Sequence, residues 1–227
     1  MNNKSVTIVS CYYKVPSKHS SSKYEEWIDN FLKDSSFNII IFTSYELMDF
    51  FSKYHNQNKN VILVIKEFEE LRIYKEYKTI WDYQHHIDNQ KNIRTKHCYV
   101  IWNSKLDFLR EAIELNPFKS DKFIWNDIGA VRDNLHESYL IEYPKYDLIS
   151  NNKIDIIMIK DFDNYEQKYF QDEIHFAGAI FGGTINTFKK LSELYYKKFD
   201  EYIHNNQFVG CDQQVLSSVY LENIKLF

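Results

Sequence analysis

The residues best suited to chemistry in this sequence follow a short apolar run at positions 123–126. The run ends in Asp127, and Gly129 and Arg132 follow within about one helical turn. An apolar run that ends in a carboxylate is typical of a buried strand that delivers one acid to its carboxyl end, where open α/β sheets bind ligands. An acid that can hold a divalent metal, next to a permanent cation, suits a phosphorylated ligand. The alternative is that Asp127 only caps the turn after the strand.

The elements that would position Asp127 alternate along the first half of the chain. Runs rich in β-branched and aromatic residues at 6–13, 37–43 and 60–65 predict strands. Amphipathic segments between them, at 24–32 and 45–54, predict helices. Strands that alternate with helices over short connections predict an α/β fold, with a doubly wound, mostly parallel central sheet flanked by helices.

The second half of the chain carries longer helices and two more strand-like runs. The predicted elements are helical excursions over 66–96, a long helix from Cys98 to the stop signal Asn116-Pro117, strands at 154–159 and 173–184, and helices over 187–204 and from Asp212 onward. On the long helix, Asn103 and Lys105 are polar. They either face a ligand or belong to the solvated side of the helix.

Composition and charge limit the possible classes of function. The 227 residues, with 44% hydrophobic and 17% aromatic content, suffice for one large domain. The net charge of −4 is spread over interspersed Lys and Glu, so no basic stripe for DNA or RNA is present. Three widely separated cysteines form no CxxC pair, which favours a reducing compartment. No apolar run approaches the roughly 18 residues of a membrane span, so a soluble, cytoplasmic protein is expected.

Glycine is scarce, and its positions point to one site. The chain has five glycines, at positions 129, 178, 182, 183 and 210. In so glycine-poor a chain, each is expected where φ is positive or where another group approaches the backbone closely. They mark three candidate loops of one site. No GxGxxG fingerprint follows the first strand, so a bound nucleotide must be held in another way.

Several short motifs, taken in order, resemble the HtrL/YibB-like family, whose members are expected to be glycosyltransferases with the nucleotide-sugar-binding GT-A fold. The motifs lie at 7–10, 24–32, 41–44, 102–105, 116–118, 123–132, 177–183 and 212–213. Together they cover nearly the whole chain. The resemblance implies a single GT-A-like domain over residues 1–227, with a nucleotide-binding half at 1–96 and a metal, sugar and acceptor half at 97–227.

The reaction implied by this resemblance moves a sugar from a nucleotide-diphosphate donor, with UDP-sugar favoured, to a glycan or another hydroxyl acceptor. In GT-A proteins a D-x-D motif at the end of a central strand places a divalent cation on the diphosphate. Here Trp125 stands at the first acid and Asp127 at the last. Mn²⁺ or Mg²⁺ is therefore expected at Asp127. Trp125 is expected either to pack on the nucleotide or to fill the core.

The resemblance also implies roles for residues outside this motif. The expected contacts are Ser10, Cys11 and Tyr12 with the base and ribose, Arg94, Lys105 and Arg132 with the diphosphate, and His175, Gly182, Gly183 and Gln213 with the sugar or the acceptor. Asp212 is expected either to be the general base or to be only the N-cap of the last helix. The alternatives to an enzyme are a catalytically degenerate module that binds a nucleotide sugar and a protein-interaction module.

Overall fold

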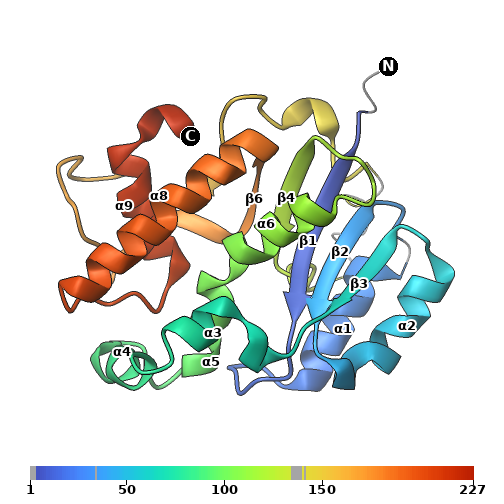
Figure 1. Ribbon diagram of the computed structural model, residues 1–227, viewed down its shortest axis with the longest axis horizontal. Coiled ribbons are helices and arrows are strands. Elements are labelled where there is room, and N and C mark those ends of the chain that lie inside the picture. The colour runs from blue at the N-terminus through green and yellow to red at the C-terminus, as the bar shows by residue number, and fades with distance from the viewer. Residues whose placement is uncertain (1–3, 34, 134–139, 141) are drawn as a thin grey trace.

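A computed structural model describes residues 4–33, 35–133, 140 and 142–227, and its centre is one six-stranded sheet in the order β3-β2-β1-β4-β6-β5 (Figure 1). The strands are β1 (Val6–Tyr12), β2 (Asn38–Thr43), β3 (Val61–Ile65), β4 (Lys122–Asn126), β5 (Asp155–Met158) and β6 (Phe176–Thr184). Strands β3, β2, β1 and β4 are parallel, and β6 runs antiparallel to both β4 and β5. The predicted α/β fold with a mostly parallel sheet is confirmed.

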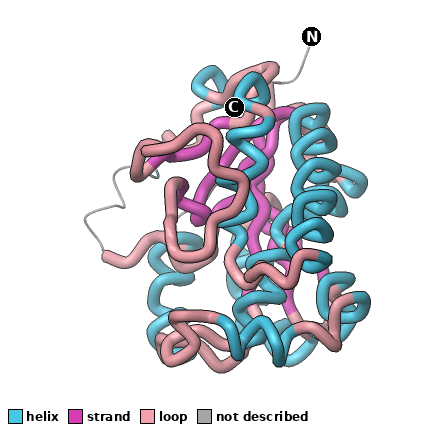
Figure 2. The backbone as a smooth tube through the Cα atoms, turned by 90° about the vertical axis from the view of Figure 1, so that its left-hand side faces the viewer, coloured by secondary structure: helices cyan, strands magenta, loops and turns pink. Residues whose placement is uncertain are grey.

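Helices connect the strands and cover the sheet. The main helices are α1 (Ser21–Leu32), α2 (Met48–Gln57), α3 (Arg72–Glu76), α4 (Trp81–Ile87), α5 (Lys96–Asn103), α6 (Lys105–Leu115), α8 (Ile185–His204) and α9 (Asp212–Glu222). In Figure 2 the strands run through the middle of the molecule, with a column of helices along one side. None of the helices in the described ranges is long and apolar enough to cross a bilayer.

Alternation along the central strands divides the core between the two faces of the sheet. Ile39 and Ile41 of β2 belong to the core cluster that includes the buried side chains of α1 and α2, whereas Ile40 and Phe42 belong to the cluster that includes those of α6, α8 and α9. Successive side chains of a strand point to opposite faces, so a strand covered on both sides is apolar throughout. This is why the run at 38–43 reads as continuously hydrophobic.

The predicted long helix from Cys98 is wrong in one respect, because it divides at Ser104 into α5 and α6. The Ser104 hydroxyl donates to the carbonyl of Val100 at 2.7 Å. The side-chain amide of Asn103 donates to the carbonyls of Tyr99 and Val209, at 2.8 and 3.0 Å. Side chains that bond the backbone in this way compete with the regular ladder and bend helices. Both Asn103 and Lys105 are buried, so neither belongs to a solvated face.

The glycines are explained by close packing and not by backbone conformation. No glycine in the described ranges has a positive φ. A Cβ atom on Gly183 would lie 2.5 Å from Thr187 Oγ1, and one on Gly210 would lie 2.5 Å from the ring of Phe208. The part of the prediction that concerned close approach is therefore confirmed.

The packing of α8 yields a direct test of this core. Leu191 is fully buried on its inner face, and Lys190 next to it is exposed. Leu191→Ala is expected to lower the free energy of unfolding by about 2–5 kcal/mol, because it removes buried methyl groups and leaves a cavity. Lys190→Ala is the control, with an expected change within about 0.5 kcal/mol. Urea denaturation of both variants measures the difference, and equal midpoints would contradict this placement of α8.

Candidate active site

A pocket opens at the carboxyl ends of β1 and β4, two parallel neighbours at the centre of the sheet. The chain leaves β1 toward β2 on one side, while β4 lies on the other side, so the pocket stands at the point where the strand order reverses. Ligands of open α/β sheets bind at such points. The cavity encloses about 150 Å³, a volume that holds a single benzene-sized ring.

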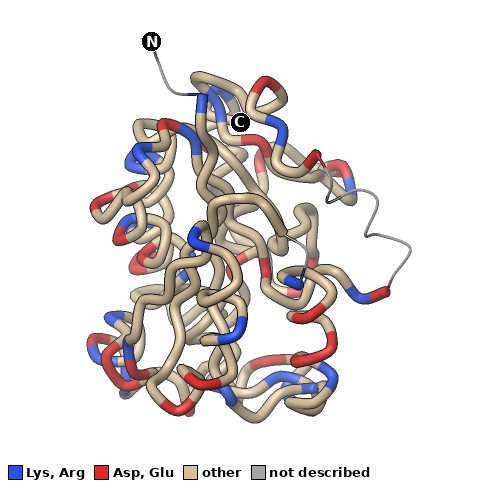
Figure 3. Tube along the Cα trace, turned by 90° about the vertical axis from the view of Figure 1, so that its right-hand side faces the viewer, with Lys and Arg blue, Asp and Glu red and all other residues tan. Residues whose placement is uncertain are grey.

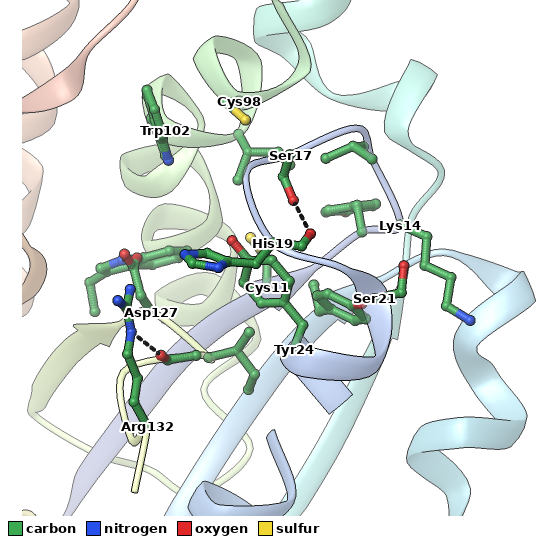
Figure 4. A pocket seen from close by; sticks show the side chains of 17 residues that line it. Cys11, Lys14, Ser17, His19, Ser21, Tyr24, Cys98, Trp102, Asp127 and Arg132 are labelled. Carbon is green, nitrogen blue, oxygen red and sulfur yellow. Dashed lines mark hydrogen bonds between the residues drawn. The ribbon is translucent and has the colours of Figure 1, made fainter. Parts of the chain in front are cut away.

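Four segments build the walls of this pocket (Figure 4). The lining residues are Cys11, Tyr12, Tyr13, Lys14, Val15, Ser17 and His19 from the end of β1 and its loop, Ser21 and Tyr24 from α1, Cys98, Ile101 and Trp102 from α5, and Trp125, Asp127, Ile128, Gly129 and Arg132 from β4 and the turn after it. Aromatic side chains form part of the wall, together with Arg132 and Lys14, and the Lys14 ammonium lies 3.4 Å from Glu25 Oε1. The loop after β1 is held in place because the Thr95 hydroxyl donates to the carbonyl of Pro16 at 2.7 Å.

Asp127 is the acid of this pocket, and its orientation is fixed by its neighbours. Its backbone amide donates to the carbonyl of Ala179 at 2.8 Å, and the amide of Ala130 donates to the carbonyl of Asp127 at 3.0 Å. Its side chain is 39% exposed, and Oδ1 accepts a hydrogen bond of 2.7 Å from Trp125 Nε1. The carboxylate is therefore presented to the pocket in one orientation.

A buried ammonium lies directly behind Asp127. Lys105 Nζ is 3.3 Å from Asp127 Oδ1 and 2.9 Å from Asp212 Oδ2, and it donates to the carbonyl of Gly178 at 2.8 Å. Burial opposes the charge of Lys105, but the carboxylates of Asp127 and Asp212 raise its pKa well above the ordinary value. Burial raises the pKa of Asp212, against the effect of Lys105. The lysine is thus a permanent internal cation.

The structure brings five of the residues predicted from the resemblance into the pocket wall: Cys11, Tyr12, Trp125, Asp127 and Arg132. Burial raises the pKa of the Cys11 thiol well above its usual range, so it is a neutral wall group. Trp125 is buried and its ring stacks on Phe108 with 6.0 Å between centroids, while one edge reaches the pocket. It therefore fills the core and lines the site at once.

Ser10 and Arg94 lie behind the wall and not in it. The Ser10 hydroxyl is fully buried and donates to the carbonyl of Asn126 at 2.6 Å, so it joins β1 to β4. Arg94 is 3.4 Å from Asp88 and lies over the ring of Trp102. Neither residue lines the pocket, although Arg94 supports the lining residue Trp102.

The predicted sugar and acceptor residues are not brought to this pocket. Gly182 and Gly183 pair with Ile124 and Phe123, because β6 runs antiparallel to β4 and carries them away from the site. His175 is buried, with its ring stacked 3.9 Å from that of Phe162. Gln213 donates to the carbonyl of Phe176 at the start of β6. Their assignment to the sugar or acceptor is thus not supported by their positions.

Asp212 is buried and packs against Gly178. A Cβ atom on Gly178 would lie only 2.9 Å from Asp212 Oδ2. The N-cap of α9 is Cys211, and Asp212 is the first residue of the helix, so the N-cap alternative does not describe Asp212. Oδ2 lies 2.9 Å from the Lys105 ammonium and has no other hydrogen-bond partner within the described chain. Its role as general base remains a prediction.

Several pocket residues were missed by sequence reasoning, above all His19, Tyr24 and Trp102. A signal existed for the α5 wall, because Cys98, Ile101 and Trp102 are spaced i, i+3 and i+4 and share one helix face. His19 lies in an irregular loop, and its ring packs edge-on against Trp27 at 4.9 Å. No periodicity marks such a loop residue.

The side chains around Asp127 do not fit a resident divalent cation of the kind that the resemblance implies. Within the described ranges, no group of three or more His, Cys, Asp or Glu side chains could hold a metal ion. One carboxylate can serve a cation that arrives on phosphates. Here, however, the ammonium of Lys105 already stands between Asp127 and Asp212.

Comparison with known proteins identifies a family and two similar structures. Residues 4–227 match the family described as "Bacterial protein of unknown function (HtrL_YibB)". No curated protein matches the chain. Mouse xyloside xylosyltransferase 1 in its apo form is similar in structure, with 12% identity, a TM-score of 0.54, and coverage of 98% of this chain and 84% of that one. The PaToxG glycosyltransferase has 13% identity, a TM-score of 0.41, and coverage of 95% and 68%.

The hydrogen bond from Trp125 to Asp127 can be tested with a matched pair of variants. Trp125→Phe keeps an aromatic ring and removes the N–H that Asp127 accepts. Trp27 is also buried, but its Nε1 has no hydrogen-bond partner within the described chain. Trp125→Phe is expected to cost about 1–2 kcal/mol more than Trp27→Phe, the contribution of a hydrogen bond to a partly exposed charged group. Guanidinium denaturation gives both values, and equal losses would show that the bond does not stabilise the fold.

Proposed function

The chain belongs to the HtrL/YibB family of bacterial proteins, and from this premise and its GT-A-type fold we propose that it transfers a sugar from a nucleotide-diphosphate sugar to a hydroxyl acceptor. The observation that supports this most is the pocket at the carboxyl ends of β1 and β4, which carries one oriented acid and an exposed arginine. This combination suits a ligand with a sugar and phosphates.

We propose that aromatic side chains bind the nucleoside of the donor and that a cationic side chain binds its diphosphate. The enclosed part of the pocket takes one ring of the nucleoside, against the faces of Tyr12, Tyr24 and Trp102. The diphosphate lies toward Arg132, whose planar guanidinium can donate to two phosphate oxygens. The Arg132 side chain is preorganised, because it lies over the ring of Trp27 at 4.6 Å and donates to the carbonyl of Gly129. A UDP-sugar is the favoured donor, as the family resemblance implies.

The transfer itself breaks the bond between the anomeric carbon and the diphosphate oxygen. The nucleoside diphosphate leaves with the bonding electrons, and the hydroxyl oxygen of the acceptor bonds to the anomeric carbon. The hydroxyl proton passes to a carboxylate. We assign this role to Asp127, because it is the carboxylate among the described residues that lines the pocket. Its fixed orientation favours one geometry for the accepting oxygen.

A second candidate function is a module that binds a nucleotide sugar without turnover. It is favoured by the pairing of Asp127 with both Trp125 and Lys105, because both partners contact Oδ1, one of the two oxygens of the carboxylate. Release of nucleoside diphosphate from a nucleotide sugar distinguishes the two, since only the enzyme produces it.

The experiment that tests the proposed function is a thermal-shift panel of UDP, GDP, CDP, ADP and their sugars, each with EDTA or with Mn²⁺. A ligand that binds only the native state stabilises it by about 2.7 kcal/mol at a hundredfold excess over its dissociation constant. A rise in Tm with one nucleotide supports the proposal and identifies the donor class. The absence of any rise, with or without Mn²⁺, would refute it. Mn²⁺ is included because a metal at Asp127 is the expectation from sequence.

A single substitution tests the role of Asp127. Asp127→Asn keeps the shape of the side chain and removes its capacity to accept a proton, so turnover is expected to fall by about 10²–10⁴-fold while UDP remains bound. Asp147→Asn is the control, because Asp147 is exposed and pairs with Lys4 away from the pocket. Initial rates of UDP release and titration calorimetry with UDP measure the two effects. An Asp127→Asn protein with wild-type turnover would exclude this assignment.

A further inference from the structure

The ammonium of Lys105 occupies a site built of oxygen atoms. Its neighbours are the carbonyl of Gly178 at 2.8 Å, Asp212 Oδ2 at 2.9 Å and Asp127 Oδ1 at 3.3 Å. The side chain is only 5% exposed. One carbonyl and two carboxylates form the kind of donor set that hard divalent cations select. In this chain the ammonium of Lys105 occupies that position.

Local structure at four chain segments creates this arrangement. The division of the helix at Ser104 makes Lys105 the first residue of α6, and Asp212 is the first residue of α9. Gly178 lacks the Cβ atom that would meet Asp212 Oδ2 at 2.9 Å. Asp127 follows the end of β4 and is also held by Trp125. All four segments must be in place before the ammonium has its three oxygen neighbours.

We propose that Lys105 is a resident cation that replaces a divalent metal in this site, so that the chain binds its nucleotide donor without Mn²⁺ or Mg²⁺. The identity of the ligand in this inference rests on the proposed function. The cation site itself does not depend on that function. A metal ion at Asp127 would lie a few ångströms from a fixed positive charge and would be repelled by it. The charge of the diphosphate is then balanced by Arg132, which lines the pocket.

The first test uses the wild-type protein and UDP as the probe. Titration calorimetry is carried out once in EDTA and once in millimolar Mn²⁺, and the same dissociation constant is expected in both. Binding of UDP only in the presence of Mn²⁺ would overturn the inference and leave the proposed function intact. Failure of every nucleoside diphosphate to bind under both conditions would overturn the proposed function, and with it the claim about the donor.

The second test addresses the cation site without any nucleotide. Lys105→Ala removes the ammonium and leaves the oxygens of Gly178, Asp127 and Asp212 around an empty volume. Mn²⁺ is expected to raise the Tm of this variant and to lose its free-ion signal in electron paramagnetic resonance, while the wild-type protein shows neither effect. UDP should then bind Lys105→Ala about tenfold or more weakly in EDTA than in Mn²⁺.

The matched control is another buried lysine at the opposite end of β4. The Lys122 ammonium donates to the carbonyls of Tyr146 and Ile149, at 3.2 and 2.5 Å, and is paired with no carboxylate among the described residues. Lys122→Ala is expected to lose stability and to gain no Mn²⁺ binding. Lys105→Met, which keeps the apolar stem, is the second variant if Lys105→Ala does not fold. Equal Mn²⁺ binding by the Lys105 and Lys122 variants would overturn the inference.

Discussion

The pocket end of the molecule depends on one interaction, the pairing of a buried lysine with two aspartates. Removing one partner of a buried ion pair typically costs about 3–5 kcal/mol, because the other charge is left uncompensated in a medium of low polarity. Lys105 and Asp212 are both almost completely buried, so each requires the other. The segments that carry them are far apart in sequence, and their charges can be compensated only when α6, β4, β6 and α9 have assembled.

The topology of the sheet explains why the pocket forms beside this pair. Strands β1 and β4 are parallel neighbours, and the segments after them leave a crevice at their carboxyl ends. Antiparallel β6 then delivers the backbone of Gly178 and Ala179 to the same edge, where their carbonyls accept from Lys105 and from the amide of Asp127. The reversed strand therefore contributes backbone oxygens, while the parallel strands contribute side chains. Lys and Arg positions alternate with Asp and Glu positions along much of the trace (Figure 3).

The sequence was sufficient to predict those features that depend on local patterns. The strands at 6–13, 37–43 and 60–65 follow from apolar runs, and Asp127 follows from the position of an acid just after such a run. The division at Ser104 could not be predicted, because it depends on hydrogen bonds that the helix pattern does not encode. The direction of β6 could not be predicted either, and it pairs Gly182 and Gly183 with Ile124 and Phe123, away from the pocket, so their contact with the sugar or the acceptor stays a prediction. The burial of Lys105 is a property of the assembled chain.

Trp125 occupies the position where the D-x-D motif of GT-A proteins would have its first acid, and this difference bears on the charge balance around Asp127. In a D-x-D arrangement, a carboxylate at this position would add negative charge beside Asp127, and a divalent cation would be needed to balance it. Trp125 instead donates a hydrogen bond to Asp127 Oδ1, and the ammonium of Lys105 approaches the same oxygen. Asp127 Oδ1 is thus contacted by a hydrogen-bond donor and by a fixed cation, both supplied by the protein itself. A tryptophan at position 125 is therefore chemically consistent with a site whose positive charge is supplied by the chain itself.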